Sequence, residues 1–324
     1  MNTYRKMIAK FGLPLVGLLT LSACGGGGDA PGAAAAVTPT TVNGVASKGL
    51  VKHARVLVCR VVNGVVQADA ACSATTSGTD GSFTLTLPDG FSGPALIKVM
   101  AASGSMMLDE TTGSDIPYNM TMRAPVPAIG AGTPVYVTPF SDMAASAMGS
   151  SGIDADKVRQ AMAGVQTLMS GLGVDLTVMP MVDLKNSAAD PTLMGKQANM
   201  VAQLTKLVMA ARTSSLLKDA NGVPCNVAGS STSEQVACAV GAMSGLMTGV
   251  ATFDKAKADA LLAAMGSQSA TAAFMPIIKT DGTLGMQLAD MTSSLSMQNV
   301  MQNAGLSSTA VAATVTTMMT GMRK

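Results

Sequence analysis

Four sets of residues in this 324-residue chain could do chemistry: five cysteines, one histidine, a serine–lysine pair and 27 methionines. Their side chains offer covalent attachment, nucleophilic catalysis and metal binding. Each of these needs partners at a particular spacing. The spacings therefore decide which chemistry the sequence supports.

The cysteines divide into an isolated residue, Cys24, and two pairs of equal spacing, Cys59 with Cys72 and Cys225 with Cys238. Four cysteines allow three connectivities, and we predict the local one, in which each pair closes its own loop. In the chain-entropy model each disulfide contributes about 3 kcal/mol. A metal site at these cysteines is disfavoured, because the chain has no C-x-x-C spacing and no second histidine.

The candidates for catalysis lack partners. His53 is the only histidine and is predicted to be a solvated turn residue. Ser215-Leu216-Leu217-Lys218 matches the S-x-x-K nucleophile motif, but no S-x-N accompanies it, and Lys279-Thr280-Asp281-Gly282 only approaches K-T-G. The simpler interpretation of residues 215–218 is a polar helix end. We therefore predict that the protein is not an enzyme.

The methionines form three close groups: Met120 with Met122, Met179 with Met181, and Met318-Met319 with Met322. Such spacings occur in Cu(I) sites, which thioethers suit. No histidine or cysteine stands near them, and methionine is also a flexible core filler. The primary prediction is a core role with no metal and no cofactor. The alternative is a periplasmic copper-handling or oxidant-scavenging protein that uses Met179 and Met181, which flank Pro180.

The N-terminus has the order of a secretory signal. Arg5, Lys6 and Lys10 are followed by the apolar run 11–21, and two small residues precede Cys24. The apolar run is shorter than the roughly 20 residues that cross a bilayer.

Leu21-Ser22-Ala23-Cys24 resembles the lipobox of bacterial lipoproteins. The resemblance implies that residues 1–23 are removed and that Cys24 carries diacylglycerol on its sulfur and an acylated amino group. Gly25 stands where inner-membrane retention usually has Asp, so the resemblance favours an outer-membrane lipoprotein. Several acyl chains make attachment stable, whereas one chain is marginal. The expected partners are the membrane, through Cys24, and another envelope protein.

The composition excludes some classes of partner. Three of the 21 Lys and Arg belong to the signal, so the mature chain is close to neutral against 19 Asp and Glu, which argues against nucleic acid. Aromatic residues are 3% and tryptophan is absent, so the chain lacks the stacking platforms of a glycan-binding face. Cores must be built from Val, Leu, Ala and Met.

Residues 24–41 are predicted to be a flexible tether, because they are mostly Gly, Ala, Pro and Thr. Residues 42–137 are predicted to be β structure. Ala54–Val62 is β-branched and partly alternating, Asn63-Gly64 favours a tight hairpin, and Ser82–Leu87 alternates strictly after Asp80-Gly81. Further strands are expected at 94–101 and 134–137. Short strands with turn signals at this spacing suggest a sandwich.

A second resemblance lies in the same region. Gly44-Val45, Ala54-x-Val56-x-Val58 and Thr79-Asp80-Gly81-Ser82-Phe83 together resemble a carboxypeptidase regulatory-like domain, a small transthyretin-like β-sandwich of secreted bacterial proteins. It covers about 60 residues and implies no peptidase activity. The family usually has Gly before the Ala, where this chain has His53.

From Thr138 the hydrophobic period changes from 2 to 3.6. Thr138-Pro139 predicts a helix start, and Ser231–Glu234 a capping box. Apolar stripes that must pack together follow. They are Val158-Met162-Val165-Met169-Leu172, Met194-Ala198-Val201-Leu204-Val208-Ala211, Val236-Val240-Met243-Met247-Val250, Leu261-Leu262-Met265, Leu284-Leu288-Met291-Leu295 and Val311-Val315-Met318-Met322.

The predicted fold class is α+β with two domains: an N-terminal Ig/transthyretin-like β-sandwich at 42–137 and a C-terminal all-α helical bundle at 138–324. The predicted function is that of a lipid-anchored envelope lipoprotein with a binding or scaffolding role.

Overall fold

The computed structural model describes residues 37–109, 114–130, 134–171, 206, 209–210, 215–219, 221–266, 272–278 and 284–290. Contacts group Val37–Lys324 into one compact unit. Cys24, Met179, Met181 and the stripe Val311–Met322 lie outside the described residues. Most of the segment that carries the predicted stripe Met194–Ala211 does so as well.

The first sheet has the order β11-β1-β6. β1 (Thr40–Ala46) lies between β6 (Ser82–Leu87), which is antiparallel to it, and β11 (Val135–Val137), which is parallel. The alternation predicted for Ser82–Leu87 is confirmed, because Phe83, Leu85 and Leu87 are buried and the residues between them are exposed.

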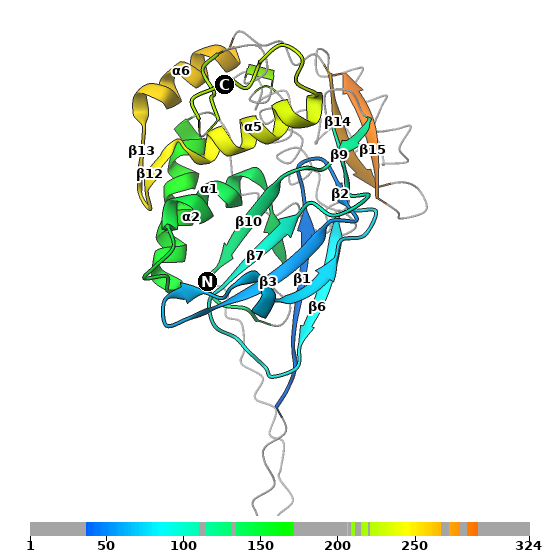
Figure 1. Ribbon diagram of the computed structural model, residues 1–324, viewed down its shortest axis with the longest axis vertical. Coiled ribbons are helices and arrows are strands. Elements are labelled where there is room, and N and C mark those ends of the chain that lie inside the picture. The colour runs from blue at the N-terminus through cyan, green and yellow to red at the C-terminus, as the bar shows by residue number, and fades with distance from the viewer. Residues whose placement is uncertain are drawn as a thin grey trace, which may run out of the picture. The chain divides into compact units, whose positions relative to one another are not determined.

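The second sheet has the order β10-β7-β3-β4, with β5 paired to β3. These strands are β10 (Thr121–Val126), β7 (Ala95–Met100), β3 (Arg55–Val62), β4 (Val65–Val66) and β5 (Ser73–Thr76) (Figure 1). The predicted hairpin turn is confirmed, with φ of 51° at Asn63 and 77° at Gly64. Buried side chains of both sheets belong to one hydrophobic core.

A smaller sheet joins β2 (Val51–Lys52), β8 (Met106–Leu108) and β9 (Asp115–Pro117). His53 follows β2 as an exposed residue with φ of 56°, in the left-handed region. Glycine adopts this conformation without steric cost. His53 lies in a bend and is exposed, which agrees with the predicted solvated turn residue.

The helix starts predicted from capping residues are confirmed. Thr138 and Ser141 form a capping box at the start of α1 (Pro139–Met148). Ser231 and Glu234 do the same for α5 (Thr232–Ser244). The other helices with defined bounds among the described residues are α2 (Ala155–Gly171) and α6 (Lys255–Gly266).

An ion pair between the buried carboxylate of Asp142 and the half-buried guanidinium of Arg123 joins the helices to the second sheet. Asp142 on α1 accepts hydrogen bonds from Arg123 on β10, from its backbone nitrogen at 3.0 Å and from Nε at 2.7 Å. Asp142 also accepts one from the hydroxyl of Ser244 on α5 at 2.8 Å, and Arg123 donates to Ser146 at 2.6 Å. Because its groups come from β10, α1 and α5, this cluster ties three elements together.

The predicted fold class is wrong, because residues 138–324 do not form an all-α helical bundle. The described part of that region contains two antiparallel hairpins besides its helices: β12 (Met247–Gly249) with β13 (Thr252–Phe253), and β14 (Ala272–Ile278) with β15 (Leu284–Asp290). Across the described residues, fifteen strands stand against four α-helices, so this part of the chain is mostly β.

The error has a physical cause. Leu284 and Leu288 are four residues apart, a spacing that places side chains together both on one helical face and on one strand face. Met286 completes the strand alternation of β15, whereas the helical interpretation used Met291. In the other hairpin, α5 ends at Ser244, before Gly245, so Met247 lies on β12 rather than on the predicted helix.

Both predicted disulfides are confirmed. Cys59 is bonded to Cys72 with their Cα atoms 4.6 Å apart, and Cys225 to Cys238 with theirs 5.4 Å apart. None of the helices in the described part of the chain has the length and apolar character needed to cross a membrane.

Candidate functional site

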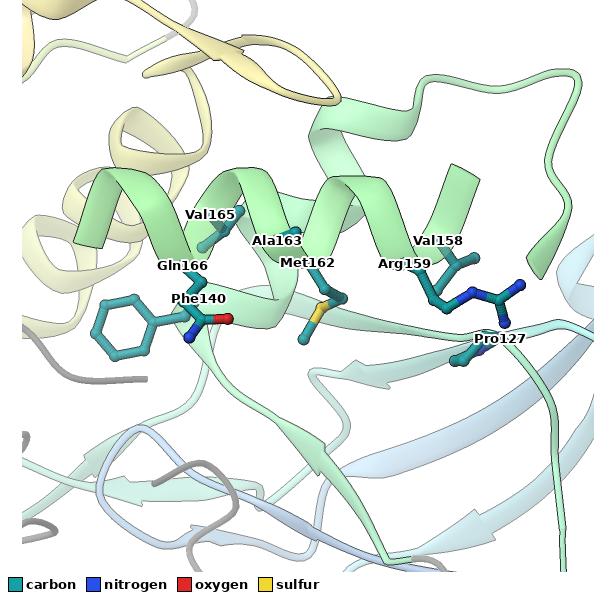
Figure 2. A pocket seen from close by; sticks show the side chains of 8 residues that line it. All are labelled: Pro127, Phe140, Val158, Arg159, Met162, Ala163, Val165 and Gln166. Carbon is teal, nitrogen blue, oxygen red and sulfur yellow. The ribbon is translucent and has the colours of Figure 1, made fainter. Parts of the chain in front are cut away.

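A pocket of about 340 Å³ lies along one side of α2 (Figure 2). Its lining consists of Pro127, Phe140, Val158, Arg159, Met162, Ala163, Val165 and Gln166. Hydrocarbon groups make up most of this surface, with one guanidinium and one primary amide. Pockets that bind small molecules combine an apolar lining with a few polar groups in the same way.

The spacing of α2 residues explains the lining. Val158, Met162 and Val165 form one row along the helix, and Arg159, Ala163 and Gln166 form the adjacent row. Residues three and four apart share a helical face, so two neighbouring rows make one continuous wall. The helix begins after Asp154, whose carboxylate accepts a hydrogen bond from the backbone nitrogen of Lys157 at 2.7 Å.

The remaining lining comes from elements that contact α2. Phe140 lies in the first turn of α1, and Pro127 directly follows β10. In Figure 2, Arg159 and Pro127 mark one end of the pocket, Phe140 and Gln166 mark the other, and Met162 projects between them. The side chains of Phe140, Val158 and Val165 are buried and form an apolar floor.

The rim of the pocket is accessible. Met162 is 38% exposed, and Arg159 and Gln166 are exposed as well. The sequence predicted Met162 to be a core residue of the Val158–Leu172 stripe, and this is wrong, because its thioether lies at the pocket surface. Val158, Val165 and Met169 of the same stripe are buried as predicted.

Arg159 supplies the positive charge of the pocket. It forms an ion pair with Asp156 one turn earlier, and the two side chains are 60% and 77% exposed. Exposed pairs of this kind contribute only about 0–1 kcal/mol. The guanidinium can therefore exchange Asp156 for an anionic ligand at little cost. Among the described residues that line the pocket, none is a nucleophile or an acid–base group.

A second hollow of about 340 Å³ lies at the start of α5 and is a less suitable binding site. Two of its polar residues, Ser231 and Glu234, are occupied by the capping box. Glu234 accepts hydrogen bonds from the backbone nitrogen of Ser231 at 2.7 Å and from its hydroxyl at 2.8 Å. The bond from the backbone nitrogen is the main reason why the pKa of the Glu234 carboxyl lies below its usual value. This hollow is thus a consequence of the capping structure at the start of α5.

The structure does not assemble the predicted catalytic candidates. Ser215 lies in a bend and Lys218 forms an isolated β-bridge with Pro224, so the S-x-x-K sequence is not on a helix and the helix end expected there is absent. Leu217 between them is buried, while Ser215 and Lys218 are exposed. Without the helical turn that brings such residues together, the motif has no geometry for catalysis.

Several of the described methionines are core residues. Met107, Met122, Met143, Met148, Met169, Met243 and Met247 are buried. Met120 is only partly exposed, so the pair at Met120 and Met122 does not present two thioethers to solvent. For these residues the core interpretation holds.

No pattern in the sequence indicated the pocket. Val158 and Val165 were assigned to the core, and the row of Arg159, Ala163 and Gln166 has the composition of an ordinary solvated helix face. Its proximity to Phe140 and Pro127 depends on tertiary packing.

Comparison of the chain with known protein families, curated proteins and solved structures found no match.

Proposed function

We propose that this protein is a lipid-anchored envelope lipoprotein with a non-catalytic binding role, and that its ligand occupies the α2 pocket. The observation that carries the proposal is the apolar floor of the pocket beside an accessible guanidinium. The lipobox-like Leu21-Ser22-Ala23-Cys24 supports the anchor and the outer membrane. The region that resembles a carboxypeptidase regulatory-like domain serves in this proposal as a scaffold.

The pocket chemistry specifies the ligand class. Phe140, Val158, Met162 and Val165 require an apolar body, and Arg159 at one end favours a carboxylate or a similar anion. The volume of about 340 Å³ is at the small end of the range for ligand pockets, roughly 300–1,000 Å³. The proposed ligand is therefore a small anionic amphiphile, such as a short fatty acid.

Calorimetric titration with octanoate tests the pocket. We expect binding roughly in the millimolar range or tighter, as ligand efficiency allows for a ligand of this size. Met162→Glu should weaken binding about tenfold or more, because it places a charged carboxylate against the apolar body of the ligand. Arg159→Gln should weaken octanoate binding and leave octanol binding unchanged.

The matched control is Leu262→Glu. Leu262 is a comparably exposed apolar residue, at 43%, on α6 and outside the pocket lining. This variant should bind octanoate like the parent. Equal binding by the Met162→Glu variant and the parent, or no binding by the parent at millimolar concentrations, would refute the pocket as the ligand site.

The anchor has a separate test. Cys24→Ser removes the sulfur that the lipobox resemblance assigns to diacylglycerol, so the variant should incorporate no fatty acid. Cells that express the parent or the variant are labelled with a fatty-acid analogue, and the protein is isolated. Equal labelling of the two proteins would contradict lipidation at Cys24 and leave the pocket proposal untouched.

A further inference from the structure

Three metal-ligating groups lie together at the edge of the second sheet. The sulfurs of Cys59 and Cys72 and a carboxylate oxygen of Asp69 are all within 4.8 Å of one another. The sulfurs are joined as a disulfide, and in that form neither is a thiolate ligand. Reduction of this bond would leave two thiols beside one carboxylate.

Local structure brings the three groups together. Asp69, Ala70 and Ala71 form a single 3-10 turn, η1, and Cys72 is its C-terminal cap. The backbone nitrogen of Cys72 donates a hydrogen bond to the carbonyl oxygen of Asp69 at 3.2 Å, which closes the turn and keeps the two residues side by side. β5 then pairs with β3, with Ser73 opposite Val58, and this brings Cys72 next to Cys59. The D-x-x-C spacing of Asp69 and Cys72 thus supplies one carboxylate and one sulfur from a single turn.

A lysine holds the carboxylate in place. Nζ of Lys98, on β7, lies 2.5 Å from one carboxylate oxygen of Asp69. The Asp69 side chain is 44% exposed, so solvent and ions reach it. Cys59 is fully buried and Cys72 is half-buried, so the sulfurs would form the inner side of the site and the carboxylate the outer side.

We propose that Cys59, Asp69 and Cys72 form a binding site for a thiophilic divalent cation such as Zn²⁺ when their disulfide is reduced. A dithiol reductant supplies two electrons and two protons and becomes a disulfide itself, which leaves two thiols in the protein. The cation then displaces the two thiol protons and binds the two thiolates and the Asp69 carboxylate. Zinc prefers four ligands, so three protein ligands leave one position for water.

The second disulfide provides an internal comparison. Cys225 and Cys238 have the same sequence separation as the first pair. Within the described residues, however, only the group of Cys59, Asp69 and Cys72 combines three such ligands at this distance. Both pairs become dithiols on reduction, so a difference between them in zinc affinity reports the contribution of Asp69 and the local geometry.

The test is a zinc titration of the reduced full chain in a Cys24→Ser background, after removal of the reductant under anaerobic conditions. Competition with a chromophoric zinc indicator should show one tight equivalent. Cys72→Ser should abolish it, and Cys238→Ser should not. Asp69→Asn should weaken it by roughly tenfold or more, because a carboxylate ligand is lost. Co²⁺ in place of Zn²⁺ should give a thiolate charge-transfer band that Cys72→Ser eliminates.

Lys98→Ala tests whether zinc affinity rises when the cation that competes for Asp69 is removed. Removal of the cation beside Asp69 should tighten zinc binding, whereas a variant that only disturbed the fold would weaken it. The proposal is overturned if the reduced parent binds no stoichiometric zinc, if Cys238→Ser abolishes the tight equivalent, or if Asp69→Asn binds like the parent.

Discussion

Replacement of Asp142 by alanine is expected to lower the free energy of unfolding by about 3 kcal/mol, the lower end of the cost of breaking a buried ion pair from one side, because the Arg123 side chain is partly exposed. Asp142 is only 4% exposed and accepts four hydrogen bonds, three from Arg123 and one from Ser244. Alanine would leave the half-buried guanidinium of Arg123 without its carboxylate. It would also remove the link between α1, β10 and α5.

Urea unfolding followed by circular dichroism measures this effect. The control is Asp259→Ala, which breaks the exposed pair of Lys255 and Asp259 on α6 and should cost at most about 1 kcal/mol. Asp142→Asn keeps the shape but loses the charge, and its effect should fall between those of the two alanine variants. If Asp142→Ala costs no more than Asp259→Ala, the cluster does not hold the helices to the sheet.

Gly164→Ala is expected to destabilise the protein by about 1–3 kcal/mol, the usual cost of overpacking. Within a helix this change normally stabilises by about 0.5–1 kcal/mol, because glycine is a poor helix former. Gly164 is buried in the middle of α2, and a Cβ there would overlap the backbone carbonyl oxygen of Val250. Val250 is part of the backbone between β12 and β13, so it cannot rotate away as a flexible side chain would.

Gly241→Ala is the matched control for Gly164→Ala. Gly241 is an exposed residue of α5, and a Cβ there would have no atom within 4 Å. This substitution should raise the free energy of unfolding by about 0.5–1 kcal/mol. Opposite signs for the two glycines in thermal unfolding are therefore expected. A stabilising effect at both would show that α2 does not approach Val250 so closely.

Local sequence signals predicted local structure well. Asn63-Gly64 predicted its turn, Thr138-Pro139 and Ser231–Glu234 predicted their helix starts, and both cysteine pairs were predicted to be disulfides. In each case the residues that make the interaction are close in sequence. Capping hydrogen bonds and short covalent loops depend little on the rest of the fold.

The predictions failed where tertiary contacts determine the local structure or the position of a residue. A pair of leucines four residues apart, Leu284 and Leu288, suits both a helix and a strand, and the partner strand β14 determines which forms. The α2 pocket required knowledge of what packs beside Arg159 and Met162. Asp69 can be recognised as a possible metal ligand only from the pairing of β5 with β3, which places Cys59 near it.

The central position of β1 has a consequence for how the chain folds. Gly44 pairs with Val135 on one side and with Phe83 on the other, so both neighbours of β1 are distant in sequence. Sheets built from such non-local pairings fold slowly, on a scale of roughly milliseconds to seconds. During synthesis, which starts at the N-terminus, β1 is made before β11. One edge of β1 therefore stays open until β11 pairs with it, and open edges invite intermolecular pairing. Protection from aggregation therefore depends on the interval between the emergence of residues 46 and 135.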